Sequence, residues 1–230
     1  MDLFGKYGIP DLSRFSVREI KFARARLGVL QAFARMLKKT DYRDIRIKDL
    51  SRVCEISEPS FYNYFPQKDD LFLYFISLWS VDVQLHTQNV RPGLAAIHEI
   101  FQYTASSTEQ NPALLREIIS YQARTDTSLS VKGITPVSLA EKTIAFGSVP
   151  DLDRYPDQGL GPVLEANLKA ALKNRELQAG ASVQVLNLVL ASVFFGLPVI
   201  VMHQSPKSLG DYYRLAIDEI LPRAKKRGKK

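Results

Sequence analysis

Residues 48–71 constrain the fold more than any other part of this 230-residue chain. They read KDLSRVCEISEPSFYNYFPQKDDL, so a short amphipathic segment precedes a break at Glu55-Ile56 and a second short segment follows it. Ser57 can cap the second segment, and Phe65-Pro66 can end it. Two helices this short, joined by a turn of only a few residues, predict a helix-turn-helix.

The second helix of this motif offers a face of hydrogen-bonding side chains. A helix this short is stable only when tertiary packing holds it, so we expect Ile56, Phe61 and Phe65 to face the core. The opposite face carries groups that suit phosphates and base edges. These residues are Glu58, Ser60, Tyr62, Asn63 and Tyr64. The pattern predicts a surface that reads DNA.

The segment SEPSFYNYFPQKDDL is similar to the third helix and following turn of the TetR family of bacterial transcription regulators. The family pattern is roughly V-S-x-x-[ST]-[LF]-Y-x-[HY]-F-x-x-K-x-x-L. The matching residues here are Ile56, Ser57, Ser60, Phe61, Tyr62, Tyr64, Phe65, Lys68 and Leu71. Upstream, residues 17–39 repeat apolar side chains at spacings of three and four, which predicts a helix with one buried stripe. The resemblance covers residues 17–75, and the remainder matches only in helical character and layout.

Three positions depart from the family pattern. Asp41 and Glu55 stand where glycine is common, and Arg46 stands where a threonine commonly opens the second helix. A left-handed backbone costs a residue other than glycine roughly 1 kcal/mol, and Glu tolerates it less well than Asp. We therefore expect a different turn geometry at Glu55, and a charged contact from Arg46 in place of a hydroxyl contact.

The resemblance implies that Tyr62, Tyr64 and Lys68 bind phosphates, while Arg46 and Lys48 bind further phosphates or guanines. We expect Ser60 and Pro59 to approach base edges or thymine methyl groups. Glu58 has two readings, which stay open: a charge that stabilises a helix N-terminus, or an acceptor for a cytosine amino group. The predicted DNA-binding residues are Arg46, Lys48, Ser57, Glu58, Pro59, Ser60, Tyr62, Asn63, Tyr64 and Lys68.

Beyond this head the chain reads as helices, with no convincing alternating strand. We predict an all-α fold with an N-terminal three-helix helix-turn-helix head and a C-terminal helical domain for ligand binding and dimerisation. The predicted divisions are an N-terminal arm (1–16), a DNA-binding domain (17–67), an effector-binding and dimerisation domain (68–221) and a basic tail (222–230). Helices are expected over residues 68–89, 94–109, 112–124, 162–178, 182–203 and 209–221.

Residues 125–161 form the one long irregular stretch, broken by Pro136, Pro150 and Pro156, with at most a short helix over 136–146. Such a loop is a functional lid or a plain connector, and both readings stay open.

Charge is distributed unevenly along the chain. Residues 1–80 carry 14 basic and 10 acidic side chains, residues 81–221 carry 11 and 14, and residues 222–230 carry 6 and none. A basic head beside an acidic body is typical of a DNA-binding domain joined to a sensing domain. The tail is a solvated end or a non-specific phosphate contact, and these readings also stay open.

Residues 177–206 contain no Asp, Glu, Lys or Arg. The run is long enough to span a membrane, which makes a membrane-associated adaptor the alternative. We favour a buried dimer helix, because its own core covers one face and a partner covers the other. The resemblance implies a four-helix dimer bundle from residues 162–178 and 182–203. Predicted interface residues are Leu168, Leu172, Leu188, Ser192, Phe195 and Gly196.

The resemblance also implies a ligand pocket among the middle helices. We predict that Phe101, Thr104, Tyr121 and Gln122 line it, because Thr104 and Gln122 are polar groups on apolar stripes and need a partner. An apolar and aromatic lining favours a lipophilic or aromatic effector. Core packing explains the same residues equally well.

The sequence offers little to support catalysis. Its three histidines have no metal-ligand spacing, Cys54 has no evident histidine partner, and no phosphate-binding glycine loop occurs. We therefore predict no enzyme activity, no cofactor and no metal, and keep a small helical enzyme as the least favoured class. With a single cysteine and no evident signal peptide, we expect a cytoplasmic protein.

Together these patterns predict a ligand-responsive transcription regulator. It binds a palindromic double-stranded operator as a homodimer, most simply as a repressor, and a small-molecule effector releases it. Activation in place of repression stays open.

Overall fold

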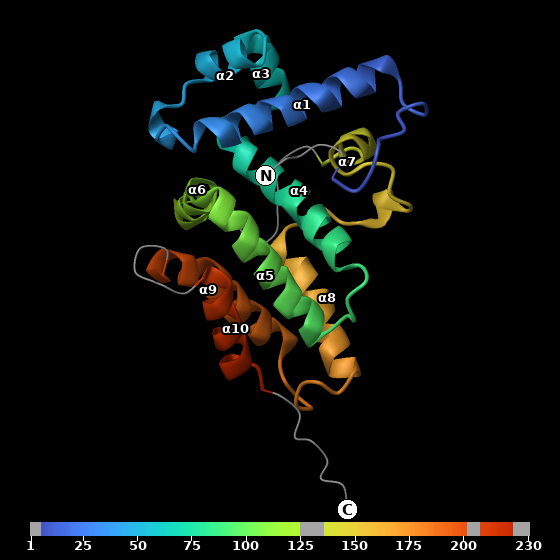
Figure 1. Ribbon diagram of the computed structural model, residues 1–230, viewed down its shortest axis with the longest axis vertical. Helices are drawn as coiled ribbons and strands as arrows, with labels where there is room; N and C mark the ends of the chain where they lie inside the picture. The colour runs from blue at the N-terminus through green and yellow to red at the C-terminus, as the bar shows by residue number, and fades with distance from the viewer. Residues whose placement is uncertain (1–5, 125–135, 202–207, 223–230) are drawn as a thin grey trace, which may run out of the picture.

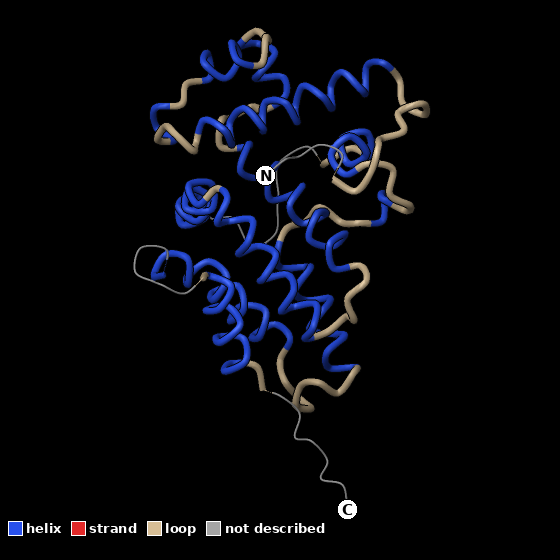
Figure 2. The backbone as a smooth tube through the Cα atoms, in the orientation of Figure 1, coloured by secondary structure: helices blue, strands red, loops and turns tan. Residues whose placement is uncertain are grey.

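A computed structural model describes residues 6–124, 136–201 and 208–222. Regular structure in these ranges is helical throughout, without a strand, which confirms the predicted all-α class (Figure 2). The α-helices are α1 (Val17–Met36), α2 (Ile47–Val53), α3 (Glu58–Tyr64), α4 (Asp70–Thr87), α5 (Leu94–Gln110), α6 (Pro112–Arg124), α7 (Leu139–Phe146), α8 (Leu160–Lys173), α9 (Val183–Val201) and α10 (Leu209–Ile220). Two short 3-10 turns, η1 (Tyr42–Asp44) and η2 (Leu152–Arg154), complete the set.

The three N-terminal helices form a head at one end of the molecule, with α1 lying across the end of α4 (Figure 1). Ser16 starts α1 with a capping box, because its hydroxyl accepts from Glu19 N–H and the Glu19 carboxylate accepts from Ser16 N–H. Fully buried Phe33, Leu50 and Phe61 come from α1, α2 and α3 and share one core cluster. The predicted helix-turn-helix is present.

The turn between α2 and α3 corrects one expectation. Glu55 adopts the left-handed conformation after all, with φ at +54°. Glu55 N–H donates to Arg52 O, and Ile56 N–H donates to Ser51 O at 3.0 Å. This is the Schellman pattern, whose hydrogen bonds satisfy helix-end carbonyls and offset the strain of the conformation. Asp41 is not left-handed, because its side chain instead accepts from Arg43 N–H and caps η1.

Helix α4 runs from the head into the body and contributes to both hydrophobic clusters. Residues along its length, from Leu71 to Leu85, belong to the cluster of the head, α6 and α7, whereas Trp79 and Val83 pack with α5, α8, α9 and α10. Figure 1 shows the body helices α5, α8, α9 and α10 gathered at the opposite end from α2 and α3. One helix is therefore shared by the end that carries the motif and the end that carries the second core.

The described part of residues 125–161 is packed structure. Helix α7 lies near α1 in Figure 1, and Ala145 and Phe146 are buried in the first cluster. The backbone of the N-terminal arm joins it there, since Tyr7 N–H donates to Phe146 O at 3.0 Å. Residues 125–135, which carry part of the lid-or-connector prediction, lie outside the described ranges, as does the basic tail from residue 223.

Helix α9 is long and apolar enough to cross a membrane by length and composition alone. It is two-sided in this structure. Leu186, Leu190 and Phe194 face the second core cluster, whereas Val185 and Leu188 are 57% and 61% exposed. The exposed side of α9 is therefore an apolar surface that a partner could cover.

Candidate DNA-binding head and ligand cavity

Helix α3 is anchored by its caps and by two aromatic side chains. The Ser57 hydroxyl accepts from Ser60 N–H at 3.2 Å. Pro59 occupies the first turn, where a backbone N–H would have no intrahelical acceptor, so the missing N–H of proline breaks no hydrogen bond. Phe61 and Phe65 are buried beneath the helix. A helix of seven residues is thereby held with its other face outward.

The outward face contains the polar residues that the sequence predicted. Glu58, Pro59, Tyr62 and Asn63 are exposed together with Ser57, and Ser60 is half-buried. Tyr64 lies at the edge of this face, half-buried, with its ring 5.3 Å from that of Phe22 on α1. The face offers hydroxyls, an amide and a carboxylate, which are the groups that read base edges and phosphates.

The start of α2 adds positive charge beside this face. Arg46 precedes the first turn without a capping hydrogen bond, and its guanidinium lies 3.4 Å from the Asp49 carboxylate. Arg52, which sequence reasoning did not select, reaches the same carboxylate at 3.0 Å. Lys48 is exposed. Exposed ion pairs of this kind are weak, so both guanidiniums can exchange Asp49 for a phosphate.

Lys68 has a more specific position than the sequence indicated. Its ammonium donates to the carbonyls of Tyr42 and Ile45, each at 2.9 Å, and lies 3.9 Å from the centre of the Tyr42 ring. Burial lowers the pKa of Lys68, and the nearby Asp41 and Asp44 carboxylates partly offset that effect. Two of its three N–H donors thus bond to backbone carbonyls within the head.

A cavity with an empty volume of about 670 Å³, counting the space at its open mouth, lies in the body. It is enclosed by α4, α5, α6, α8 and α9. Its lining residues are Phe75, Ile76, Trp79, Thr104, Ser107, Thr108, Asn111, Leu114, Leu115, Ile118, Gln122, Leu160, Phe194 and Phe195. Most are apolar, and none of these side chains is charged.

Two of the four predicted pocket residues line this cavity. Thr104 and Gln122 are in the lining, although the Thr104 hydroxyl already donates to Ile100 O at 2.7 Å. Phe101 and Tyr121 are not among its lining residues. Phe101 packs into the second core against Tyr213, 4.9 Å between ring centres, and Tyr121 packs against Phe72 at 5.7 Å. Both sit on the adjacent face of their helix.

The sequence reading missed Trp79 and Asn111. The predicted lining came only from the helices expected over residues 94–109 and 112–124, and Asn111 falls between them. The signal was present for Trp79, since Phe75, Ile76 and Trp79 follow one another at a helical spacing on α4. For Asn111 the sequence held no sign of burial.

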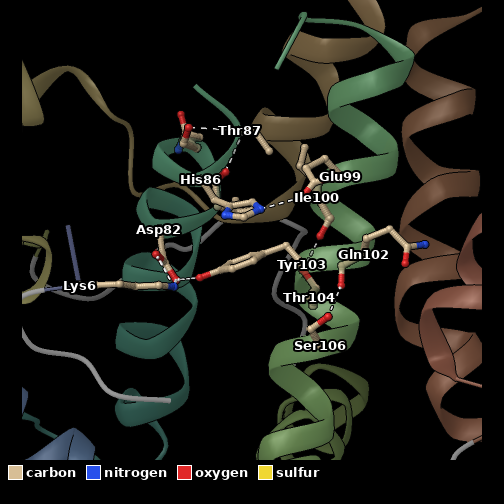
Figure 3. Close-up of polar contacts among 12 residues, drawn as sticks. Lys6, Asp82, His86, Thr87, Glu99, Ile100, Gln102, Tyr103, Thr104 and Ser106 are labelled. Carbon is tan, nitrogen blue, oxygen red and sulfur yellow. Dashed lines mark hydrogen bonds and ion pairs between the residues drawn. The ribbon is translucent and has the colours of Figure 1, made fainter. Parts of the chain in front are cut away.

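A polar cluster ties the N-terminal arm to α4 and α5 (Figure 3). The Asp82 carboxylate, fully buried, accepts from Lys6 Nζ at 2.8 Å, Tyr7 Oη at 2.8 Å and Tyr103 Oη at 2.6 Å. Burial and the Asp82 carboxylate raise the pKa of Tyr7. His86 stacks on the Tyr103 ring, 4.1 Å between centres. These groups satisfy one another, so the cluster anchors the arm to the body.

The predicted dimer residues divide into two groups. Ser192 and Leu188 are exposed, while Gly196 is half-buried with open space where a Cβ would extend. Leu168 is fully buried in the second core cluster. Leu172 packs partly against that core, and Phe195 lines the cavity. The apolar face that is left open lies along α9.

These features define a helix-turn-helix protein with an all-helical body that contains a cavity. Residues 29–75 match the family model of bacterial regulatory proteins, tetR family. No curated protein sequence matches the chain.

Solved structures share the fold at low sequence identity. FadR of Thermus thermophilus, a TetR-family repressor in complex with lauroyl-CoA, has a TM-score of 0.58 at 18% identity, over 89% of this chain and 100% of that chain. FadR of Bacillus subtilis in complex with stearoyl-CoA has a TM-score of 0.55 at 11% identity, covering 84% and 95%. The TetR-family protein CprB of S. coelicolor A3(2) has a TM-score of 0.53 at 15% identity, covering 88% and 90%. Residues 29–75 are therefore similar to the helix-turn-helix of the tetR family, and the described chain shares the fold of solved TetR-family proteins.

Proposed function

We propose that this protein represses transcription by binding a palindromic DNA operator as a homodimer, and that an uncharged lipophilic ligand releases it. The observation that carries the proposal is the anchored helix α3, which turns Tyr62 and Asn63 outward while Phe61 and Phe65 hold it from beneath. A short helix with a polar outer face, preceded by a second short helix, fits a major groove.

DNA contacts divide into positioning contacts and base readout. Tyr62, Lys48 and Lys68 would bind phosphates, which sets the register of the protein on DNA without sequence choice. Pro59, Ser60 and Asn63 would approach base edges. Glu58, in the first turn of α3, would either stabilise the N-terminus of the helix by its charge or accept a hydrogen bond from a cytosine amino group.

The homodimer is supported by the open face of α9. Val185, Leu188, Ser192 and Val199 repeat at spacings of three, four and seven, and all four are exposed. Contact with a second copy would cover this stripe and place two heads on one duplex, with half-sites about 34–36 Å apart. Burial of this face against a second copy also explains why α9 carries no charged side chain.

The cavity supports a ligand that is largely apolar. The neighbouring FadR structures hold acyl-CoA molecules, and an acyl chain would suit a lining of this kind. The lining side chains of this chain include no Lys or Arg for the phosphates of coenzyme A. We therefore favour an uncharged lipophilic effector. It would act through α4, which lines the cavity and reaches the head.

Salt-dependent binding to a mixed-sequence duplex tests the proposed DNA-binding role. Affinity should fall steeply with salt, and Lys48→Ala should lower the slope of log K against log salt by about one phosphate. Lys169→Ala, on an exposed part of α8, is the matched control and should leave the slope unchanged. The proposal fails if the wild-type protein does not bind duplex at low salt, or if the two variants behave alike.

A further inference from the structure

Asn111 connects the cavity to the head. It lies between α5 and α6, is 5% exposed, and its Nδ2 donates to Ala34 O at 3.0 Å. Ala34 is in the last turn of α1, where carbonyls lose their intrahelical donors. Lys38 N–H, the donor that a continuing helix would offer to Ala34 O, bonds to Arg35 O instead. The Asn111 amide therefore satisfies the end of a head helix.

The same side chain also borders the cavity. Asn111 lines the cavity, and its Oδ1 is buried without a hydrogen-bond partner among the described residues. Rotating the amide would turn Oδ1 onto the Ala34 carbonyl, oxygen against oxygen, so the present orientation is fixed by chemistry. A buried acceptor without a partner is unfavourable, which makes Oδ1 a position for a ligand donor.

Trp79 supplies the complementary group. Its indole also lines the cavity, is 6% exposed, and has its Nε1–H buried without a partner in the described part of the chain. An indole N–H only donates, whereas an amide oxygen only accepts. The cavity therefore suits a ligand that offers one acceptor and one donor on an apolar body. A carboxylate or phosphate would be buried there without a countercharge.

We propose that Asn111 couples the cavity to the DNA-binding head, and that the ligand bound by Asn111 is an uncharged lipophilic alcohol. The ligand hydroxyl donates to Asn111 Oδ1, and its oxygen or a second oxygen accepts from Trp79. Hydrogen bonds in a chain polarise one another, so a bond at Oδ1 strengthens the Nδ2–H bond to Ala34 O. Ligand binding thereby stiffens the attachment of α1 to the body. The effect of this coupling on DNA binding rests on the proposed function. The two tests below use no DNA, so they can succeed or fail independently of that function.

Ligand chemistry can be read directly, because Trp79 is the single tryptophan of the chain. The 1-alkanols from hexanol to dodecanol, their methyl ethers and the matching carboxylates would be titrated while Trp79 emission is followed. At least one alkanol should bind about ten-fold tighter than its methyl ether and its carboxylate. That preference should fall to about two-fold or less in Asn111→Ala and remain in Thr108→Val, which lines the same cavity. Absence of alkanol binding, or equal binding of alkanol and ether, overturns the ligand assignment.

Coupling is read by hydrogen exchange of the amides in residues 33–40. A saturating alkanol should slow exchange of this segment about three-fold or more in the wild-type protein and in Thr108→Val. The slowing should disappear in Asn111→Ala. Asn111→Ser serves the same purpose if the alanine variant does not fold, since a serine hydroxyl cannot span both groups. Equal slowing in the Asn111 variants and the wild type overturns the coupling role. A protein that passes both tests yet binds no duplex would refute the proposed function alone.

Discussion

The guanidinium of Arg26 and the carboxylate of Glu141 lie 3.0 Å apart between α1 and α7, with side chains only 2% and 0% exposed. The Tyr74 hydroxyl, from α4, donates to the same Glu141 oxygen at 2.7 Å. Burial, followed by the Glu141 charge, raises the pKa of Tyr74 well above its ordinary value, so the hydroxyl stays a donor. Three helices of the head and body thus meet at one buried carboxylate.

Removing the Glu141 carboxylate should strongly destabilise the folded protein. Glu141→Ala leaves the buried Arg26 charge unpaired and removes the capping box of α7, so the free energy of unfolding should drop by about 3–5 kcal/mol. Urea denaturation measures it. Glu165→Ala breaks the exposed Lys169 pair and should change stability by less than about 1 kcal/mol. A loss under about 1 kcal/mol at Glu141 would show that the pair does not hold α7 to the head.

Lys68 should contribute to both protein stability and DNA binding, whereas Lys48 should contribute to DNA binding alone. Lys68→Ala removes two hydrogen bonds to backbone carbonyls and should lower the free energy of unfolding by about 1–3 kcal/mol, besides weakening DNA binding. Lys48→Ala, at an exposed position, should weaken only DNA binding. Thermal unfolding without DNA separates the two, and equal melting temperatures in both variants would contradict the structural role of Lys68.

Charge on the open face of α9 should separate the subunits. Gly196→Glu and Leu188→Glu each place a carboxylate in the proposed interface, where it would be buried without a partner. Both variants should yield monomer or aggregate by light scattering. Leu215→Glu, at an equally apolar exposed position on α10, should leave the oligomer intact. The interface is refuted by a well-folded wild-type monomer at micromolar concentration.

Cys54 should react slowly. Burial raises the pKa of its thiol, with a smaller opposing effect from Arg35, and its Sγ lies 3.8 Å from Gly28 O. A raised pKa leaves less thiolate at a given pH, so at pH 8 modification by a disulfide reagent should be about ten-fold slower than in the unfolded protein. The rate should keep rising above the ordinary thiol pKa of about 8.5. A native rate equal to the unfolded rate would contradict this environment.

The helices were predictable because strong local signals mark them. The apolar repeat predicts α1, and Ser57 together with Pro66 marks the two ends of α3. The Glu55 turn was not predictable, because its left-handed backbone is held by hydrogen bonds to residues of the preceding helix. The intrinsic preference of Glu disfavours this conformation, and the local hydrogen bonds of the Schellman turn offset that preference.

Which residues line the cavity is difficult to predict from sequence for a geometric reason. Helical periodicity identifies an inward face, and it cannot separate a residue that lines a cavity from one packed in the core beside it. Thr104 and Phe101 lie on the same inward side, yet only Thr104 reaches the cavity. Leu168 shows the same limit, since an apolar residue on a presumed interface helix turned inward. Which of two neighbouring apolar positions faces space depends on contacts far apart in sequence.

Selection of bound sequences from random duplex DNA with the purified wild-type protein is the most direct test of the central claim, that the head reads DNA as part of a dimer. The account predicts a palindrome whose half-sites are centred about one helical turn, roughly 34–36 Å, apart. Asn63→Ala should relax the preference within each half-site, because its amide lies on the outer face of α3. Enrichment of no sequence, or of a single unpaired half-site bound by one subunit, would contradict the account.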